Sequence, residues 1–203
     1  MSVAGLLLAA GAGRRMGVPK ALLTDGGRPL AGTVVERLRR AGCSSVTVVV
    51  GASAEEAAVL LRPYDVEVVV ADGWATGMGA SMRRGLEALG DERAAGVTAA
   101  LVTLVDLPDV DEQVMGRVLE EWRNRGADED ALLRATYGGL PGHPVLIGRA
   151  HWPALLEVLA GDQGARRYLA EREVVPVPCD DLATGRDVDR PADLRAAAPS
   201  DPA

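Results

Sequence analysis

The stretch "LLLAAGAGRRMGVPK", residues 6–20, runs from an apolar segment into a glycine-rich loop that ends on the only lysine of the 203-residue chain. Glycine tolerates positive φ and has no side chain, so such a loop lets backbone N–H groups approach an anion closely. The glycines and cations of the loop are Gly11, Gly13, Gly17, Arg14, Arg15 and Lys20. An apolar strand followed by this loop predicts a phosphate-binding site.

Short apolar, valine-rich runs alternate with longer amphipathic segments along most of the chain. This alternation predicts parallel strands joined by crossover helices, which is an α/β fold. The first four runs are almost wholly apolar, as expected for strands that helices cover on both faces. The predicted strands are 3–8, 46–50, 66–70, 97–105, 132–136, 144–147 and 174–178. The predicted helices are 32–41, 54–61, 80–89, 112–124, 152–159 and 164–172, and a hairpin-like insertion is expected around "GGLPG", residues 138–142.

The composition indicates one acidic domain. A chain of this length can bury one continuous core, and we expect residues 1–195 to form a single domain with a disordered tail at 196–203. The net charge of −7 argues against the concentrated basic face that nucleic-acid binding requires. The apolar run 3–10 lacks a basic start and is too short to span a membrane. We therefore expect a cytoplasmic protein with no nucleic-acid or membrane partner, and with Cys43 and Cys179 as free thiols.

Two other phosphate-binding patterns do not fit the loop. A Walker loop places Lys and then Ser or Thr directly after its last glycine, whereas Gly17 is followed by "VPKA". A dinucleotide fingerprint needs G-x-G-x-x-G at the start of a helix and an acidic residue about 20 positions further on. Here the spacing is G-x-G-x-x-x-G, Pro19 discourages immediate entry into a helix, and the second strand runs into "VVVGAS". The sequence therefore favours neither a P-loop NTPase nor an NAD-binding domain.

The segment "LAAGAGRRMGVPKALL" resembles the signature loop of MobA-like NTP transferases, in particular the cytidylyltransferases and guanylyltransferases of molybdenum cofactor maturation. The resemblance reaches to about Leu194. It implies a three-layer α/β/α domain with a Rossmann-like, mostly parallel sheet of the nucleotide-diphospho-sugar transferase type. It also implies that the loop holds a triphosphate whose charge Arg15 and Lys20 neutralise. The nucleotide contacts that it assigns are Leu8, Ala9, Ala10, Gly11, Gly13, Arg14, Arg15, Lys20 and Ser81. An Arg- and Gly-rich surface turn with no ligand is the alternative.

Two aspartates are the Mg²⁺ ligands that the same resemblance implies. "LVTLVDLPDV" places Asp106 directly after a buried strand, at the carboxyl edge where open α/β sheets bind ligands. "DVDRPADL" resembles the second acidic motif of the family, which would make Asp189 the partner ligand. Two carboxylates with phosphate oxygens and waters suit Mg²⁺. Asp189 could instead cap a helix before the following proline, and the two roles could coexist. Arg15, Lys20 and Asp106 are the expected catalytic residues.

Three further segments match the family with less specific residues. "GWATGMGASMRRGL" offers Ser81 beside the base and ribose, or merely as a helix N-cap. "GGLPGHPVLIGR" resembles the Gly-His-Pro segment on the acceptor side, where His143 either contacts the acceptor or is structural. "AGDQGARRYL" supplies Arg166, either as a contact for an anionic acceptor or as part of a solvated helix face. His151 is expected to be structural.

The implied reaction is transfer of CMP from CTP to a phosphorylated acceptor, with molybdopterin favoured, and release of pyrophosphate. Within the family, Ala10 is typical of cytidylyltransferases, whereas guanylyltransferases usually have glycine there. A phosphate nucleophile is already anionic at pH 7, so the reaction needs no general base. A molybdoenzyme or its chaperone is a possible further partner. The alternatives are a guanylyltransferase or another NTP transferase, with a phosphosugar, phosphorylated alcohol or phospholactate acceptor, and a non-catalytic protein that delivers nucleotide or cofactor.

Overall fold

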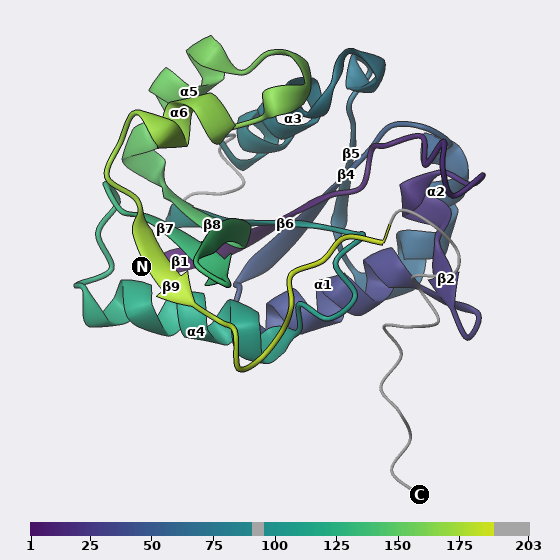
Figure 1. The fold of residues 1–203 in the computed structure, drawn as a ribbon. Helices are drawn as coiled ribbons and strands as arrows, with labels where there is room; N and C mark the ends of the chain where they lie inside the picture. The colour runs from purple at the N-terminus through teal and green to yellow at the C-terminus, as the bar shows by residue number, and fades with distance from the viewer. Residues whose placement is uncertain (91–95, 189–203) are drawn as a thin grey trace, which may run out of the picture.

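A seven-stranded sheet with the order β5-β4-β1-β6-β8-β7-β9 forms the centre of the computed structural model, which describes residues 1–90 and 96–188. The strands are β1 (Ser2–Leu8), β4 (Ser45–Val50), β5 (Glu67–Val70), β6 (Val97–Leu104), β7 (Leu132–Tyr137), β8 (Leu140–Gly148) and β9 (Val175–Pro178). Neighbouring strands are parallel except at β8, which is antiparallel to both β6 and β7 (Figure 1). The expected mostly parallel, Rossmann-like sheet is confirmed. The predicted tail, 196–203, lies outside the described residues.

The strand β1 lies between β4 and β6 and sets the edge at which the functional loops leave the sheet. Leu8, its last residue, pairs with Val49 of β4 on one side and with Leu104 of β6 on the other. All three strands run in the same direction, so the loops that follow them emerge together at the carboxyl edge. This is the edge of an open α/β sheet at which ligands bind.

Helices cover both faces of the sheet and produce three layers (Figure 1). One face carries α1 (Leu30–Ala41), α2 (Ala54–Leu61) and α4 (Glu112–Asn124), and the other carries α3 (Met78–Gly90), α5 (Trp152–Val158) and α6 (Arg166–Ala170). Successive side chains of a strand point to opposite faces, so Leu7 joins the first core and Leu6 the second. In the described residues, none of the helices combines the length and apolar character needed to cross a membrane.

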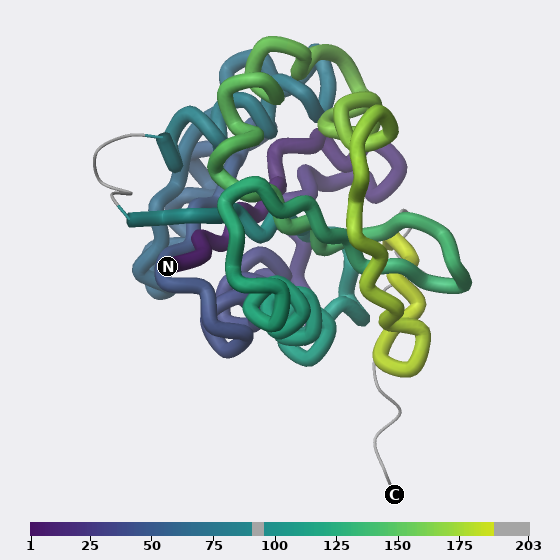
Figure 2. Tube along the Cα trace, turned by 90° about the vertical axis from the view of Figure 1, so that its left-hand side faces the viewer, coloured from purple at the N-terminus to yellow at the C-terminus, as the bar shows by residue number. Residues whose placement is uncertain are grey.

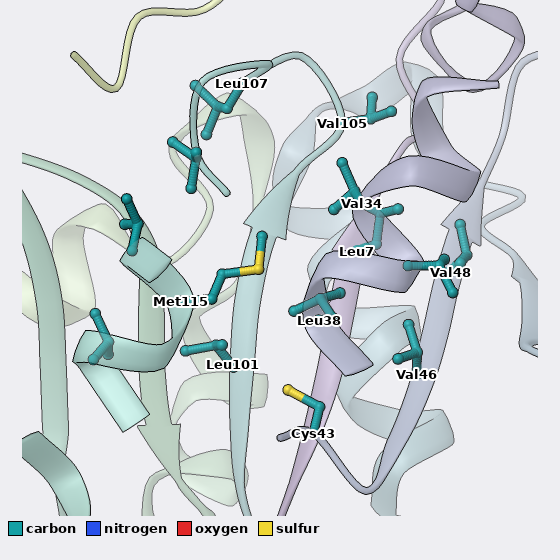
Figure 3. Close-up of a cluster of buried hydrophobic side chains, with 14 of the residues drawn as sticks. Leu7, Val34, Leu38, Cys43, Val46, Val48, Leu101, Val105, Leu107 and Met115 are labelled. Atoms are coloured by element: carbon teal, nitrogen blue, oxygen red, sulfur yellow. The ribbon is translucent and has the colours of Figure 1, made fainter. Parts of the chain in front are cut away.

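The first core packs the helices α1 and α4 against the centre of the sheet. Figure 3 shows Leu38 of α1 and Met115 of α4 beside Leu7 and Leu101 of the strands, and all four are fully buried. The helix α1 ends as predicted at Gly42, whose φ of 108° is left-handed. Glycine adopts this conformation without strain, and it lets the chain turn back into β4.

The structure departs from the predicted elements mainly in the second half of the chain. The strand β8 begins at Leu140, four positions before the predicted start, because Gly138 and Gly139, both with positive φ, form a two-residue turn. Leu140 therefore pairs directly with Tyr137. The predicted helix 164–172 shortens to α6 at 166–170. The two-residue strands β2 (Thr24–Asp25) and β3 (Arg28–Pro29) were not predicted, because such short strands leave no periodic pattern.

We predict that Leu38→Ala lowers the free energy of unfolding by about 2–5 kcal/mol, because it leaves a cavity in a fully buried layer. Urea denaturation followed by circular dichroism measures this change. Leu140→Ala is the control, since the side chain is 71% exposed and its loss should change stability by less than about 0.5 kcal/mol. Equal effects of the two substitutions would contradict the assigned core.

Candidate functional site

A cavity of about 560 Å³ opens at the carboxyl edge, beside the ends of β1 and β6. Most of the predicted nucleotide contacts line it together with the predicted metal ligand of the β6 loop. These residues are Leu8, Ala10, Gly11, Gly13, Arg14, Arg15, Lys20, Ser81 and Asp106. Ala9 does not line the cavity; it is buried, and its N–H donates to the Val49 carbonyl oxygen at 2.9 Å. The chain thus gathers segments that lie up to 179 positions apart, from Leu8 to Asp187, around one cavity.

The glycine loop is closed by its own backbone hydrogen bonds. The amides of Met16 and Gly17 both donate to the Gly13 carbonyl oxygen, at 2.8 and 2.9 Å, and the Lys20 amide donates to the Gly11 carbonyl oxygen at 3.0 Å. Gly13 has a φ of 58°, and a Cβ there would overlap the Val18 carbonyl oxygen. Among the described residues, no protein acceptor is recorded for the amides of residues 12–14. Those amides are available to an anion.

Lys20 reaches across the cavity to Asp106. Its Nζ donates to Oδ2 of the carboxylate, although the two residues are 86 positions apart. The Asp106 side chain is only 5% exposed and the Lys20 side chain 27%. A buried carboxylate is costly unless it is paired, so the lysine stabilises the charge of Asp106. The pair puts one cation and one carboxylate beside the free amides of the glycine loop.

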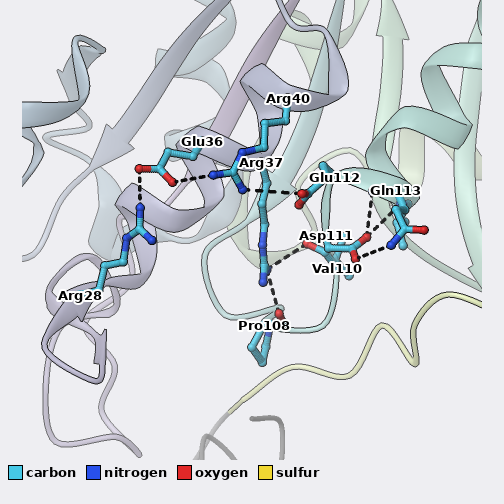
Figure 4. A network of polar contacts seen from close by, with 10 residues as sticks. Arg28, Glu36, Arg37, Arg40, Pro108, Val110, Asp111, Glu112 and Gln113 are labelled. Carbon is cyan, nitrogen blue, oxygen red and sulfur yellow. Dashed lines mark hydrogen bonds and ion pairs between the residues drawn. The ribbon is translucent and has the colours of Figure 1, made fainter. Parts of the chain in front are cut away.

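The loop that carries Asp106 is fixed by α1. Arg37 donates from Nη1 to the carbonyl oxygens of Pro108 at 2.8 Å and Val110 at 3.3 Å (Figure 4). Asp111 then caps α4, with Oδ1 accepting from the Gln113 amide at 2.9 Å. These bonds hold both ends of the turn after Asp106.

Residues 179–188, named here the C-terminal strap, pass over the same loop. The Val188 amide donates to the Asp106 carbonyl oxygen at 2.8 Å. Thr184 donates from its amide and its hydroxyl to Asp109 Oδ2, at 2.7 and 2.6 Å. Figure 2 shows the strap, in yellow, near the β7–β8 hairpin, where the Gly138 amide donates to Asp180. The strap is therefore attached at both of its ends.

Arg117 of α4 holds the outer part of the strap. Its two terminal nitrogens donate to the two oxygens of the Asp181 carboxylate, at 2.5 and 2.8 Å. These hydrogen bonds lower the pKa of Asp181 to about 2. The pair is solvent-exposed, so it fixes geometry more than it adds stability.

The strap brings Asp187 to the cavity that Asp106 lines. Asp187 was not predicted as a site residue, although it begins the same "DVD" motif as Asp189. Asp189, the predicted second metal ligand, lies outside the described residues. Within residues 1–90 and 96–188, no three His, Cys, Asp or Glu side chains form a metal cluster. Mg²⁺ usually needs only one or two protein carboxylates beside waters and phosphate oxygens. The donors fit a cation shared with a bound phosphate.

The far wall of the cavity comes from α3 and the 3₁₀ turn before it. Ser81 lies inside α3, which begins at Met78, and is 5% exposed. The alternative of Ser81 as the helix N-cap is therefore wrong. Trp74 also lines the cavity and offers an aromatic face. A Cβ at Gly51 would collide with the Trp74 ring, so only glycine fits there. Trp74 was missed because a lone aromatic residue carries no sequence pattern.

A second cavity of about 900 Å³ adjoins the first. The two share Leu8, Met78, Leu104, Asp162 and Asp187 as lining residues. His143 and Arg166, the predicted acceptor contacts, both line the second cavity, and Arg134 of β7 joins them. Arg134 was not predicted, because a single arginine inside a strand belongs to no motif. His151 instead bonds Tyr168, with Nδ1 and Oη 2.9 Å apart, which fits the predicted structural role.

His143 lies among positive charges. Burial lowers its pKa to about 4, and the charges of Arg134 and Arg166 contribute in the same direction. The Tyr137 hydroxyl donates to the His143 carbonyl oxygen at 2.7 Å and fixes the backbone at this position. At pH 7 the imidazole is therefore neutral, so it can accept or donate a hydrogen bond but adds no positive charge to the cavity.

Comparisons with known proteins agree on the fold, but the names of the similar proteins refer to different activities. A model of the MobA-like NTP transferase domain matches residues 5–176. Nicotine blue oxidoreductase of Paenarthrobacter nicotinovorans is 37% identical over an alignment of 199 residues, which covers 92% of this chain and 92% of the relative. The crystal structure of Rv0371c from Mycobacterium tuberculosis H37Rv is 26% identical, covers 98% of each chain and superposes with a TM-score of 0.80.

More distant structures share the fold. A complex of Rv0371c with manganese is 24% identical, covers 98% of this chain and all of that chain, and has a TM-score of 0.76. Molybdopterin-guanine dinucleotide biosynthesis protein A of Archaeoglobus fulgidus is 22% identical, covers 97% of this chain and 96% of that chain, and has a TM-score of 0.69.

We predict that Thr184→Val speeds hydrogen exchange of the Val188 amide, because the strap loses the Thr184 hydroxyl bond to Asp109 and opens more often. Exchange followed by mass spectrometry or NMR measures the change. Thr24→Val is the matched control, because Thr24 lies in the exposed β2–β3 hairpin, distant in sequence from the strap. It should leave the exchange rate of the Val188 amide unchanged. Unaltered exchange in Thr184→Val would show that the hydroxyl does not hold the strap.

We predict that the His143 imidazole titrates near pH 4 and stays neutral from pH 6 to 8, as its lowered pKa requires. The unfolded chain takes up this proton at about pH 6.5, so the contribution of His143 to stability is complete above pH 6.5 and is lost as the pH falls toward 4. NMR of the ring carbons gives the midpoint directly, with His143→Gln to assign the signal. A midpoint near 6.5 would contradict the described environment.

Proposed function

The chain belongs to the MobA-like NTP transferase family, and we propose that it transfers CMP from CTP to a phosphorylated acceptor with release of pyrophosphate. The observation that carries the proposal is the ion pair of Lys20 with Asp106, in a cavity that the glycine loop lines. Residues 1–195 form the nucleotidyltransferase domain in this proposal, and we assign the reaction to the cytoplasm.

In the proposed complex, the glycine loop holds the triphosphate. The amides of residues 12–14 would donate to phosphate oxygens, since they have no recorded acceptor among the described residues. Arg14 and Arg15 line the same cavity and would neutralise the phosphate charge. Lys20 has a flexible stem and a compact charge, so it can leave Asp106 and follow the α-phosphate as its geometry changes.

Asp106 would then hold a divalent cation, with Asp187 or the proposed ligand Asp189 as the second carboxylate. Mg²⁺ would supply charge neutralisation at the transferring phosphate and the pyrophosphate. Rv0371c, which is similar to this chain, has a structure in complex with manganese. That complex supports a divalent cation at this site. The buried position of Asp106 keeps its carboxylate oriented toward the cavity edge.

The transfer itself would need alignment more than acid–base chemistry. The phosphate of the acceptor attacks the α-phosphorus of CTP, the bond to the β-phosphate oxygen breaks, and pyrophosphate leaves. The attacking phosphate is already anionic, so the neutral His143 need not act as a base. Catalysis would come from holding the reactants in line and from stabilising charge with Arg15 and Lys20.

The choice of base and acceptor rests on fewer residues. Ala10 lines the cavity and is 5% exposed, which leaves less room at this point than glycine would. Trp74 and Ser81 could contact the base and ribose. We propose molybdopterin as the acceptor because His143 of the Gly-His-Pro segment lines the adjoining cavity, and a molybdoenzyme or its chaperone would receive the product.

A second candidate function follows from the relative that is 37% identical and is named an oxidoreductase. An activity of that kind would require a hydride donor, such as a nicotinamide dinucleotide, in the cavity that we assign to CTP. The loop spacing differs from the dinucleotide fingerprint, and for that reason nucleotidyl transfer is the first proposal. Nucleotidyl transfer predicts that the cavity prefers CTP, whereas the oxidoreductase candidate predicts that it prefers a nicotinamide dinucleotide.

We predict that calorimetric titration gives tighter binding of CTP than of GTP, ATP or NADPH, and that Mg²⁺ strengthens it. Lys20→Ala should weaken CTP binding at least tenfold and reduce turnover about 10²–10³-fold, because it removes a charge from the phosphates. Arg28→Ala is the control, since Arg28 is exposed and pairs with Glu36 outside the cavity. Pyrophosphate release from CTP and molybdopterin measures turnover.

The outcomes separate the candidates. Selective binding of GTP would move the assignment to guanylyl transfer. Binding of NADPH with consumption of hydride would favour the second candidate. Failure to bind any of the three triphosphates would contradict nucleotidyl transfer, and CTP binding without pyrophosphate release in the presence of molybdopterin would favour a delivery protein or another acceptor.

A further inference from the structure

Two arginines of the second cavity form no ion pair within the described residues. Arg134 of β7 and Arg166 at the start of α6 both line this cavity. Neither has a recorded ion pair or hydrogen bond within the described part of the chain, and the Nε of Arg134 is buried without an acceptor. Burial and the charge of Arg166 both lower the pKa of Arg134. Arg134 is half-buried and Arg166 is exposed. A buried donor without an acceptor is costly, so the Nε of Arg134 indicates that a ligand supplies the missing acceptor beside these two arginines.

Apolar side chains form much of the remaining wall of the second cavity, beside the polar groups of Thr136, His143, Asp162, Gln163 and Asp187. Its walls include Met82, Val102, Val145, Ile147, Leu169 and Val174. Arg134 is in register with Val145 of β8 and Pro176 of β9, so the guanidinium rises from the sheet between apolar neighbours. A ligand that fits must therefore combine an apolar or flat body with a polar edge.

Arg134 lies well away from the glycine loop along the sheet. The strand order places β6 and β8 between β1 and β7, so three strand spacings of about 4.8 Å each separate the two strands, or about 14 Å in total. The cavities share Asp187 and Met78, among other residues, and so adjoin. One elongated molecule can reach both the α-phosphate position and Arg134.

We propose that Arg134 and Arg166 bind the far end of the acceptor, and that this end presents two coplanar hydrogen-bond acceptors, as a carboxylate or the carbonyl and ring-nitrogen edge of a fused heterocycle does. This inference rests on the proposed nucleotidyl transfer for the identity of the ligand as acceptor. A guanidinium donates two parallel hydrogen bonds to either edge. The acceptor is then an elongated phosphomonoester with an apolar or aromatic middle. An acceptor with a cationic end would be repelled by the two guanidinium groups, and one as short as phospholactate would not span both cavities.

The test uses small probes of the far end in the absence of nucleotide. The probes are 2-naphthoate, which has a carboxylate edge, pterin, which has a carbonyl and ring-nitrogen edge, and 2-naphthalenemethanol, which has neither. We expect the wild-type protein to bind 2-naphthoate, pterin or both at least tenfold more tightly than 2-naphthalenemethanol, as measured by calorimetry or ligand-observed NMR. The tighter of the first two identifies which edge the arginines prefer.

Substitutions then test whether the two arginines cause the tighter binding of the probes that carry an acceptor edge. Arg134→Gln and Arg166→Gln should each abolish it, and Arg134→Lys should retain only part of it because a lysine lacks the planar fork. Arg167→Gln is the matched control, since this neighbour on α6 is 81% exposed at its side chain and pairs with Glu171. Thermal melting checks that each variant folds, and Arg166→Gln decides the question if Arg134→Gln does not fold.

The result that would overturn the inference is equal affinity of the wild type for the three probes, or a preference that survives in both glutamine variants. Titration with CTP separates this failure from failure of the proposed function. If CTP binds and the probe preference is absent, only the far-end site is wrong. If the preference is present and no triphosphate binds, the site stands and nucleotidyl transfer is wrong.

Discussion

The ion pair between Lys20 and Asp106 depends on the central position of β1 and is the contact around which the candidate site is arranged. Leu8 pairs with Leu104 at the ends of β1 and β6, and this pairing brings together two loops that are 86 positions apart. A buried carboxylate requires a partner, and the only lysine of the chain provides it. Arg37 and the C-terminal strap then fix the Asp106 loop from both sides.

Positive charge is placed locally in a chain whose net charge is −7. Arg14, Arg15 and Lys20 line the first cavity, and Arg134 and Arg166 line the second. Asp162 and Asp187 line both cavities as well, so the cations can bind anions at two positions without making either cavity uniformly positive. The two positions differ in surroundings, because the first has free backbone amides and the second has apolar walls. A molecule with a phosphate at one end and a hydrogen-bond-accepting edge at the other matches both.

Membership of the MobA-like NTP transferase family coexists with 37% identity to a relative named an oxidoreductase. One fold can carry different chemistries, because function depends on the groups at the site. The groups of the first cavity on which we base the proposed choice of ligand are Ala10, Trp74 and the Lys20–Asp106 pair. The overall fold does not discriminate between the two activities.

Local sequence determined the elements of this protein, because periodicity and helix-ending residues act over a few positions. The helices 54–61 and 112–124 match their predicted bounds, and all seven strands of the sheet were predicted. The glycine loop follows β1 at the carboxyl edge, where the sequence predicts phosphate binding. The sequence could not predict that Arg134 lines a cavity with Arg166, nor that the strap brings Asp187 to Asp106. Those arrangements depend on strand order and long-range hydrogen bonds, which join residues with no common pattern. Only the tertiary structure decided them, because a donor such as the Nε of Arg134 becomes buried without an acceptor only when the chain has packed.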